Sequence, residues 1–324
     1  MMKISLIGFG SWGIPLASLL NQNGHEVTAW DNENYINELL KTRVNKYLPK
    51  YKIPSSINIT HSVEIAAQSA EMFVFALASK DICAAAKKFA PFFGAEKIII
   101  NVSKGLIEDS RICEYLQKLT SSPVAVLTGP SHAEEVLKNI PTAVVAASEN
   151  EKTAEVVQNV FAAENFRVYT STDIIGAEIG GALKNIIAVA AGCSDGLGFG
   201  DNTKAALITR GIAEITRLGI ALGAKKETFG GLSGIGDLIV TCTSQHSRNW
   251  RAGHSLAQGN SLAETLTTIG GVAEGVDTAK TALRLARKHS VNMPIVEEIN
   301  KILFENKNPK DAVVDLMLRD KKGE

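Results

Sequence analysis

Hydrophobic and polar residues in the first half of the chain follow two alternating patterns. Short apolar runs predict strands at residues 3–7, 26–30, 72–78, 96–103, 122–128, 142–148 and 166–171. The segments between them carry apolar residues at helical intervals, as at residues 14–25 and in the alanine-rich stretch from about Lys80. Strands that alternate with helices predict an α/β fold with a parallel, doubly wound sheet of the Rossmann type, which binds ligands at the carboxyl ends of its strands.

The pattern changes near Gly176, after which helical periodicity dominates. Helices are predicted at residues 177–192, 202–223 and 276–290. A length of 324 residues also favours two domains. We therefore expect a dinucleotide-binding Rossmann domain at residues 1–175 and an all-α substrate-binding and catalytic domain at residues 176–324.

A glycine motif directly follows the first predicted strand. Gly8, Gly10 and Gly13 have G-x-G-x-x-G spacing and precede a predicted helix. In this motif the first glycine permits a tight turn, the second lets backbone amides approach a pyrophosphate, and the third lets the helix pack closely on the strand. The alternative is an ordinary glycine turn, but the strand before the motif and the helix after it favour dinucleotide binding.

Asp31 stands at the end of the second predicted strand, about twenty residues after the motif. A carboxylate there can bind a ribose 2′-hydroxyl and would repel the 2′-phosphate of NADP. The next residues, Asn32 and Glu33, supply no cation. NAD is therefore the expected cofactor and NADP is disfavoured, unless Asp31 is a solvated loop acid.

Composition excludes several other classes of protein. The 34 basic and 34 acidic residues give no net charge, which argues against a nucleic-acid partner. No run approaches the ~20 apolar residues of a membrane span, and the N-terminus does not resemble a secretory signal. The four cysteines and six histidines show no metal-ligand spacing, so we expect no metal. A cytoplasmic protein with reduced thiols is the expectation.

Polar residues follow two of the predicted strands in the first half. Lys104 ends one of them, and Ser131 follows a turn at Gly129 after another. Both are therefore expected at the ligand-binding edge of the sheet. Ser131 can also be a helix N-cap with Glu134 three residues on, and Lys104 can be a surface lysine.

Three polar patches interrupt the helical second half. They are Lys184 in the apolar segment GGALKNIIAVAAG, Asp237 after GGLSGIG, and the triplet Ser247, Arg248 and Asn249. Each patch has a structural alternative. The lysine can extend to the surface, the aspartate can be a helix N-cap, and the triplet can be a solvated turn.

Together, these patches and the glycine motif resemble the bacterial NAD(P)-dependent glycerol-3-phosphate dehydrogenase family over nearly the whole chain. The segments that carry the resemblance are, in order, GFGSWG, HEVTAW, NKYLP, NVSKGL, LTGPSHAEEV, GALKNIIAVAAG, GLSGIGDLIVTCTSQHSRNWRAG and GGVAEGV. The resemblance implies reversible hydride transfer between NAD(P)H and dihydroxyacetone phosphate, giving sn-glycerol 3-phosphate for phospholipid synthesis. It is also compatible with a homodimer.

The resemblance implies a role for each matching residue. Lys184 would be the catalytic acid and base, with Lys104 and Asp237 beside it. The cofactor would contact Ser11, Trp12, Lys104, Ala133, Arg248, Val272 and Glu274. The substrate would contact Lys104, Gly129, Ser131, Lys184, Asp237, Ser247, Arg248 and Asn249.

The chain departs from the family pattern at Asn32, where members often carry Arg or His that can serve a 2′-phosphate. Two other functions remain open from the sequence. One is a related two-domain dehydrogenase of a 3-hydroxyacid or a sugar-phosphate acid. The other is a non-catalytic protein that senses NAD, although such a protein would not need Lys104, Lys184 and Asp237 together.

Overall fold

The computed structural model describes residues 1–107, 110–321 and 323. Contacts divide the chain into two compact units. The first consists of Met1–Lys104 and Ser110–Glu178, and the second contains Ile179–Glu324 together with the short strand β8 (Leu106–Ile107). The functional domain limits of 1–175 and 176–324 stay a prediction.

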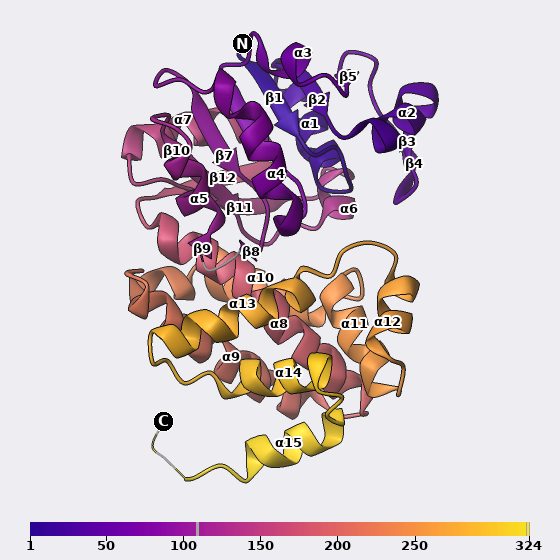
Figure 1. The fold of residues 1–324 in the computed structure, drawn as a ribbon, viewed down its shortest axis with the longest axis vertical. Helices are drawn as coiled ribbons and strands as arrows, with labels where there is room; N and C mark the ends of the chain where they lie inside the picture. Colours follow the sequence, from indigo (N-terminus) through magenta and orange to yellow (C-terminus); the bar gives the residue numbers. More distant parts are fainter. Residues whose placement is uncertain (108–109, 322, 324) are drawn as a thin grey trace. The chain divides into compact units, whose positions relative to one another are not determined.

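An eight-stranded sheet forms the centre of the first unit (Figure 1). Its strands lie in the order β12-β11-β10-β7-β6-β1-β2-β5. In chain order they are β1 (Lys3–Ile7), β2 (Glu26–Trp30), β5 (Asn58–Thr60), β6 (Met72–Phe75), β7 (Ile98–Asn101), β10 (Val124–Thr128), β11 (Thr142–Ala147) and β12 (Phe166–Ser171). Since β1 is flanked by β2 and β6, the strand order reverses there, and this switch point is where such sheets bind ligands.

One pair of strands departs from the predicted parallel arrangement. Strands β10 and β11 are antiparallel, whereas β11 and β12 are parallel again. The connection from β10 to β11 contains only the four-residue helix α6 (Ala133–Val136). A parallel crossover is usually made by an α-helix that runs back along the sheet, and a helix of four residues is too short for this. The sheet is therefore mixed, within the Rossmann-like class that the sequence predicts.

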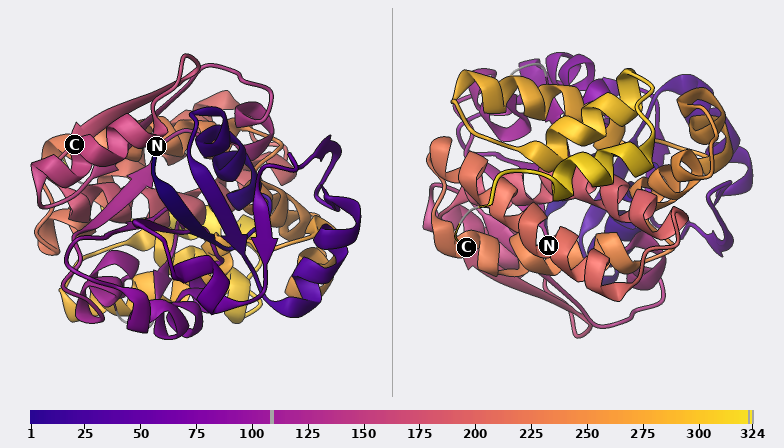
Figure 2. Two further views of the ribbon diagram at one scale, coloured as in Figure 1. Left: turned by 90° about the horizontal axis from the view of Figure 1, so that it is seen from above. Right: turned by 90° about the horizontal axis from the view of Figure 1, so that it is seen from below.

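Helices cover both faces of this sheet (Figure 2, left). Helix α1 (Gly13–Gln22) contacts α6 and α7 (Glu151–Phe161), while α4 (Ser79–Phe89) contacts α3 (Val63–Ala67) and α5 (Ile112–Lys118). Helix α2 (Glu33–Thr42), the pair β3 (Val44–Asn45) and β4 (Leu48–Lys52), and β9 (Ser110–Arg111) complete the unit. All four residues of β6 are buried, as expected for a strand covered on both sides.

The second unit is helical (Figure 2, right). Its helices are α8 (Ile174–Gly196, which begins in the first unit), α9 (Asp201–Ala221), α10 (Asp237–Thr243), α11 (Arg248–Ala257), α12 (Leu262–Ile269), α13 (Glu274–Lys288), α14 (Pro294–Phe304) and α15 (Pro309–Met317). A short helical turn at Leu232–Gly236 leads into α10. The predicted change from alternating strands and helices to helices alone is confirmed.

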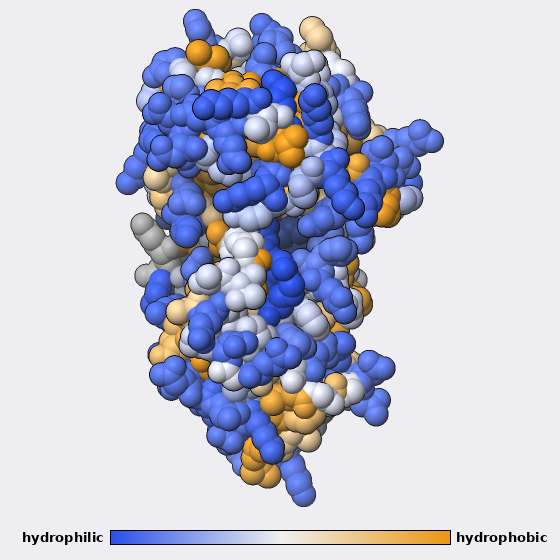
Figure 3. Space-filling model, turned by 90° about the vertical axis from the view of Figure 1, so that its right-hand side faces the viewer, coloured by the Kyte–Doolittle hydropathy of each residue, from blue (hydrophilic) through white to orange (hydrophobic). Residues whose placement is uncertain are grey.

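Helix α8 is long and apolar enough to cross a membrane, but 94% of its most apolar window is buried inside the structure. This burial is typical of the core helix of a soluble protein. On the face drawn in Figure 3, hydrophilic residues predominate and apolar residues form small separate patches.

Candidate active site

The glycine loop after β1 has a different steric requirement at each glycine. Gly8 has φ +100°, and a Cβ there would lie 2.8 Å from the backbone of Ala76, which follows β6. A Cβ on Gly13 would lie 2.0 Å from the carbonyl oxygen of Gly8. A Cβ on Gly10 would meet no atom within 4 Å. Gly8 and Gly13 therefore serve the turn and the packing of α1, and Gly10 faces open space.

These features fit the pyrophosphate of a dinucleotide. Helix α1 begins at Gly13 and has no acidic residue in its first turn, so its N-terminal N–H groups present a positive dipole end. The buried indole Nε1 of Trp12 has no hydrogen-bond partner within the described residues, which leaves a donor beside the loop. The space over Gly10 allows an anion to approach the backbone.

Asp31 orders the glycine loop from the end of β2. Its Oδ2 accepts a hydrogen bond from the backbone N–H of Phe9 at 2.8 Å, and its Oδ1 accepts from the N–H of Asn32 at 2.8 Å. Burial, which leaves the residue 6% exposed, raises the pKa of this carboxyl. Asp31 is thus not a solvated loop acid. Asn32 is the N-cap of α2, where its Oδ1 accepts from the N–H of Tyr35.

Lys104, Gly129 and Ser131 meet at the carboxyl ends of β7 and β10, which are neighbours in the sheet. The Lys104 Nζ donates to the Gly129 carbonyl oxygen at 2.8 Å, and the Ser131 Oγ donates to the same oxygen at 2.9 Å. Gly129 has φ +146°, and a Cβ there would lie 2.9 Å from the Val144 Cα. The predicted position of Lys104 and Ser131 at the carboxyl ends of strands is confirmed, and the structure also brings the two residues together at Gly129.

The alternative interpretation of Ser131 as a helix N-cap is wrong. Helix α6 begins at Ala133, its N-cap residue is His132, and no side chain caps it. Ser131 lies one residue too early, and its hydroxyl turns back to the Gly129 carbonyl instead. The hydroxyl therefore belongs to the Lys104 cluster.

A buried lysine and aspartate form the centre of the polar cluster in the second unit. The Lys184 Nζ, on α8, donates to the Asp237 Oδ1 at 2.5 Å and to the Thr241 Oγ1 at 2.7 Å. The Thr241 hydroxyl in turn donates to the Asp237 carbonyl oxygen at 2.6 Å. Lys184 is 5% exposed and Asp237 is 1% exposed. The lysine does not extend to the surface, and two oxygen atoms hold its ammonium inside the unit.

Small residues on α8 make room for this pair. A Cβ on Gly180 would lie 2.3 Å from the carbonyl oxygen of Ser233, in the turn that precedes α10. Asp237 is the first residue of α10, and the residue in the capping position is Gly236. The N-cap interpretation of Asp237 is therefore wrong, because its carboxylate binds Lys184. The sequence analysis missed Thr241, which the i,i+4 spacing from Asp237 on a helix could have indicated.

Two asparagines join three helices next to this cluster. The Asn249 Nδ2 donates to the Asn185 Oδ1 at 2.9 Å, and the Asn249 Oδ1 accepts from the Gly275 N–H at 2.9 Å. Asn185 follows Lys184 on α8, and Gly275 lies in the first turn of α13. Asn249 thus fixes the start of α11 against α8 and α13. Its Nδ2 carries two hydrogens, and the bond to Asn185 uses one of them.

The triplet at residues 247–249 opens a helix rather than a solvated turn. Ser247 is the N-cap of α11, and its Oγ accepts from the N–H of Trp250 at 3.2 Å. Arg248 is half-buried. A Cβ on Gly271, which has φ +114°, would lie 2.6 Å from the Arg248 Nη1. A guanidinium, a serine hydroxyl and a helix N-terminus thus lie close together, and all three suit an anionic group.

The remaining predicted residues lie in these same neighbourhoods. In the first unit, Ser11 belongs to the glycine loop and Ala133 begins α6. In the second unit, Val272 lies next to Gly271, and Glu274 begins α13 beside Gly275. Among the residues that the structure describes, there is no group of three or more histidines, cysteines and acidic residues that could hold a metal.

A Rossmann-like sheet with an open glycine loop, joined in sequence to a helical unit with a buried lysine and aspartate, defines a two-domain dehydrogenase that uses a nicotinamide dinucleotide. Models of the NAD-dependent glycerol-3-phosphate dehydrogenase family match the chain over residues 3–154 with the N-terminal part and over residues 173–314 with the C-terminal part. The chain belongs to this family.

Individual relatives resemble the chain over its whole length. A glycerol-3-phosphate dehydrogenase [NAD(P)+] of Thermoanaerobacter sp. (strain X514) is 52% identical and aligns over 100% of this chain and 99% of its own length. The enzyme of the same name from Bacillus subtilis (strain 168) is 48% identical, over 100% of this chain and 96% of its own. The crystal structure of glycerol-3-phosphate dehydrogenase from Coxiella burnetii has a TM-score of 0.95 at 35% identity and covers 98% of this chain and 99% of its own.

Proposed function

We propose that the chain is a glycerol-3-phosphate dehydrogenase [NAD(P)+] that reversibly reduces dihydroxyacetone phosphate to sn-glycerol 3-phosphate, with Lys184 as acid and base. Family membership supports the activity. The observation that carries the catalytic assignment is the buried Lys184–Asp237 pair, in which a lysine side chain that is only 6% exposed is held against a carboxylate. The nicotinamide, when bound, supplies or accepts the hydride.

Lys184 moves the proton that accompanies the hydride. In reduction its ammonium donates a proton to the carbonyl oxygen of the substrate, and in oxidation the neutral amine accepts the hydroxyl proton. The Asp237 carboxylate stabilises the charged form, and Thr241 fixes the direction in which Nζ points. A general acid of this kind contributes roughly 10²–10⁴-fold to the rate.

The start of α11 binds the substrate phosphate in this account. The Arg248 guanidinium supplies charge and a fork of donors, and the N–H groups at the helix N-terminus add their dipole end. The Ser247 hydroxyl accepts from Trp250 N–H and keeps its own hydrogen to donate. Asn249 donates its second amide hydrogen. These donors select a phosphorylated ketone over an unphosphorylated one.

In the first unit, Lys104, Gly129 and Ser131 contact the substrate, and Lys104 also contacts the cofactor. The cofactor further contacts Gly8, Gly10, Ser11, Trp12, Gly13, Asp31, Asn32, Ala133, Arg248, Val272 and Glu274. Asp31 favours NAD over NADP. Its buried carboxylate lies at the end of β2. The 2′-phosphate of NADP would place a second negative charge near this carboxylate, and the two charges would repel each other.

The product, glycerol 3-phosphate, serves phospholipid synthesis in the cytoplasm in this proposal, and the enzyme acts as a homodimer. A panel of ketones tests the activity by following NADH consumption. Dihydroxyacetone phosphate is expected to be reduced, with NADH preferred to NADPH. Reduction of a 3-oxoacid with NADH, or oxidation of a sugar-phosphate acid with NAD, in its place would indicate a related dehydrogenase, and NADH binding without turnover would indicate a sensor.

A further inference from the structure

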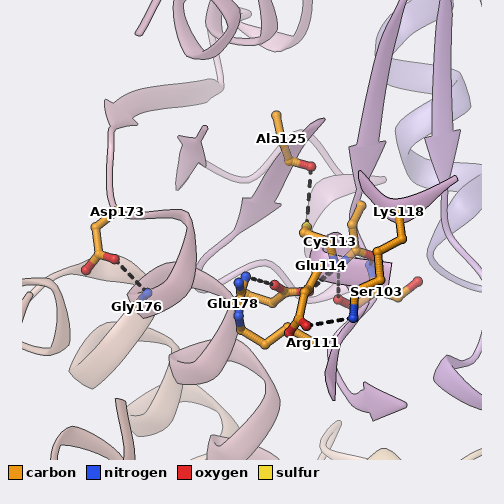
Figure 4. Close-up of polar contacts among 10 residues, drawn as sticks. Ser103, Arg111, Cys113, Glu114, Lys118, Ala125, Asp173, Gly176 and Glu178 are labelled. Carbon is orange, nitrogen blue, oxygen red and sulfur yellow. Dashed lines mark hydrogen bonds and ion pairs between the residues drawn. The ribbon is translucent and has the colours of Figure 1, made fainter. Parts of the chain in front are cut away.

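A buried acidic residue that the sequence analysis did not single out lies behind the Lys104 cluster. Glu178, on the first-unit part of α8, is 3% exposed. Its Oε2 pairs with the Arg111 Nη1 at 2.9 Å, and its Oε1 accepts from the Cys113 backbone N–H at 2.7 Å (Figure 4). Arg111 and Cys113 lie at the start of α5, so the carboxylate occupies a fixed position against that helix.

Glu178 has one more partner, and this partner connects it to the sheet. The Asn101 Nδ2 donates to the Glu178 Oε1 at 3.4 Å. Asn101 is the last residue of β7 and is 0% exposed. The Glu178 Oε1 accepts this bond, so the amide nitrogen of Asn101, and not its amide oxygen, faces the carboxyl group. Glu178 therefore favours the amide orientation of Asn101 in which Nδ2 points toward α8.

That orientation determines how the chain continues after β7. The Asn101 Oδ1 accepts from the Ser103 N–H at 2.9 Å, and its Nδ2 also donates to the Ser103 carbonyl oxygen at 3.2 Å. The Ser103 hydroxyl donates to the Leu77 carbonyl oxygen at 2.6 Å, which ties the segment to the end of β6. Hydrogen bonds thus hold the backbone N–H, the backbone carbonyl and the side-chain hydroxyl of Ser103.

Lys104 is the next residue. Its Nζ reaches the Gly129 carbonyl oxygen, which Ser131 also binds. A lysine amine sits at the end of a flexible stem of four carbon atoms, so its direction depends on how firmly the lysine backbone is held. The contacts form one continuous path from Glu178 through Asn101 and Ser103 to the Lys104 amine.

We propose that Asn101, held in one amide orientation by Glu178 and by the Ser103 backbone, is the positioning residue for Lys104. Neither side chain needs to touch the substrate or the cofactor. The inference rests on the proposed function, in which Lys104 contacts both. It differs from a general stabilising role because the effect on the reaction must pass through the Lys104 amine.

A double-mutant cycle on the full-length enzyme tests this inference. Asn101→Asp keeps the size of the side chain and the acceptor for Ser103, but it places an oxygen against Glu178. Its kcat/KM for dihydroxyacetone phosphate is measured in the parent and in the Lys104→Ala background. We expect a loss of about 10-fold in the parent, and less than about 2-fold where the amine is already absent, since coupled residues are not additive.

A buried asparagine outside this path serves as a matched control. The Asn300 amide donates to the carbonyl oxygens of Ala279 and Val296 at 2.9 and 2.8 Å. Asn300→Asp is expected to lower the unfolding temperature, with the same fold-change in kcat/KM in both backgrounds. If Asn101→Asp does not fold, Glu178→Gln removes the orienting carboxylate at constant size and takes its place in the cycle.

Equal losses from Asn101→Asp in both backgrounds would overturn the positioning role and leave the proposed function intact. The single variant Lys104→Ala separates the positioning inference from the proposed function. If Lys104→Ala alone retained the parent kcat/KM, the role of Lys104 in the proposed function would be wrong, and the positioning inference would be wrong with it.

Discussion

Gly13 packs against Gly8 so closely that a single methyl group on Gly13 would lie 2.0 Å from the Gly8 carbonyl oxygen. Three residues before Gly13, Gly10 has no atom within 4 Å of the same methyl position. The two glycines therefore have different roles. Gly13 allows α1 to pack on the loop, and Gly10 leaves space for a ligand to approach the loop.

This separation predicts opposite results for two alanine substitutions. Gly13→Ala should destabilise the protein by about 3 kcal/mol or prevent folding, because the overlap is with backbone atoms. Gly10→Ala should fold with the parent unfolding temperature but raise the Kd for NADH by roughly 10-fold, which corresponds to a loss of about 1.4 kcal/mol. Thermal unfolding and a fluorescence titration with NADH measure the two effects. Gly230→Ala, where a Cβ also meets no atom within 4 Å, should change neither quantity.

The pair Asp31 and Asn32 predicts how cofactor choice can be altered. Parent enzyme should use NADH with a kcat/KM about 10-fold or more above that for NADPH, because Asp31 repels a 2′-phosphate. Asn32→Arg should raise kcat/KM for NADPH by about 10-fold, since a guanidinium can pair with the phosphate. Asn34→Arg adds the same charge two residues along α2 and should not have this effect. A preference for NADPH in the parent would contradict the role of Asp31.

Arg248 predicts a selective loss of substrate affinity. Arg248→Ala should raise KM for dihydroxyacetone phosphate by roughly 10²-fold, because a charge-assisted contact with phosphate is lost. Reduction of unphosphorylated dihydroxyacetone should change much less. Arg251→Ala, which removes the next arginine of α11, is the control and should keep the parent KM. Equal loss with both ketones would argue against a phosphate site.

Glu214 predicts a pH dependence of stability. Burial raises the pKa of this carboxyl to about 7 from a usual value of 4.5, although the N–H groups of Ile295 and Val296 donate to it. Between these two pH values the folded chain holds a proton that the unfolded chain has lost, so the contribution of Glu214 to stability falls as pH rises. The fall approaches about 3 kcal/mol in total and is complete above the folded pKa.

Glu214→Gln should remove this dependence, because an amide does not titrate, although its single oxygen can replace only one of the two carboxylate oxygens that accept from Ile295 and Val296. The measurement is the free energy of unfolding at pH 5 and at pH 8. The difference between the two values should shrink in Glu214→Gln and stay as in the parent in Glu227→Gln, an exposed control. An unchanged difference in Glu214→Gln would show that another group titrates.

Sequence patterns predicted the elements whose residues repeat a simple rule. Strands at residues 3–7, 26–30 and 166–171 have the bounds that were expected, because each is a short apolar or alternating run that ends at glycine or polar residues. The sequence analysis did not predict that β11 runs antiparallel to β10, because the periodicity of residues along one strand carries no information about the direction of its neighbour.

Within the candidate site, the sequence identified the lysines and the aspartate but not the groups that hold them. Thr241 looks like any helical threonine until the fold brings it to Lys184. Glu178 and Asn101 are 77 residues apart and stand in apolar surroundings that give no sign of a shared hydrogen bond. Such partners depend on tertiary packing, which residue spacing alone does not encode.

Substitution of Lys184 tests the central claim most directly. In Lys184→Met, turnover of dihydroxyacetone phosphate with NADH should fall by about 10²–10⁴-fold, the contribution of a general acid, while the Kd for NADH stays as in the parent. Lys301→Met, which removes a more exposed lysine of α14, should keep full turnover. A Lys184→Met enzyme that folds, binds NADH and turns over at the parent rate would contradict the account.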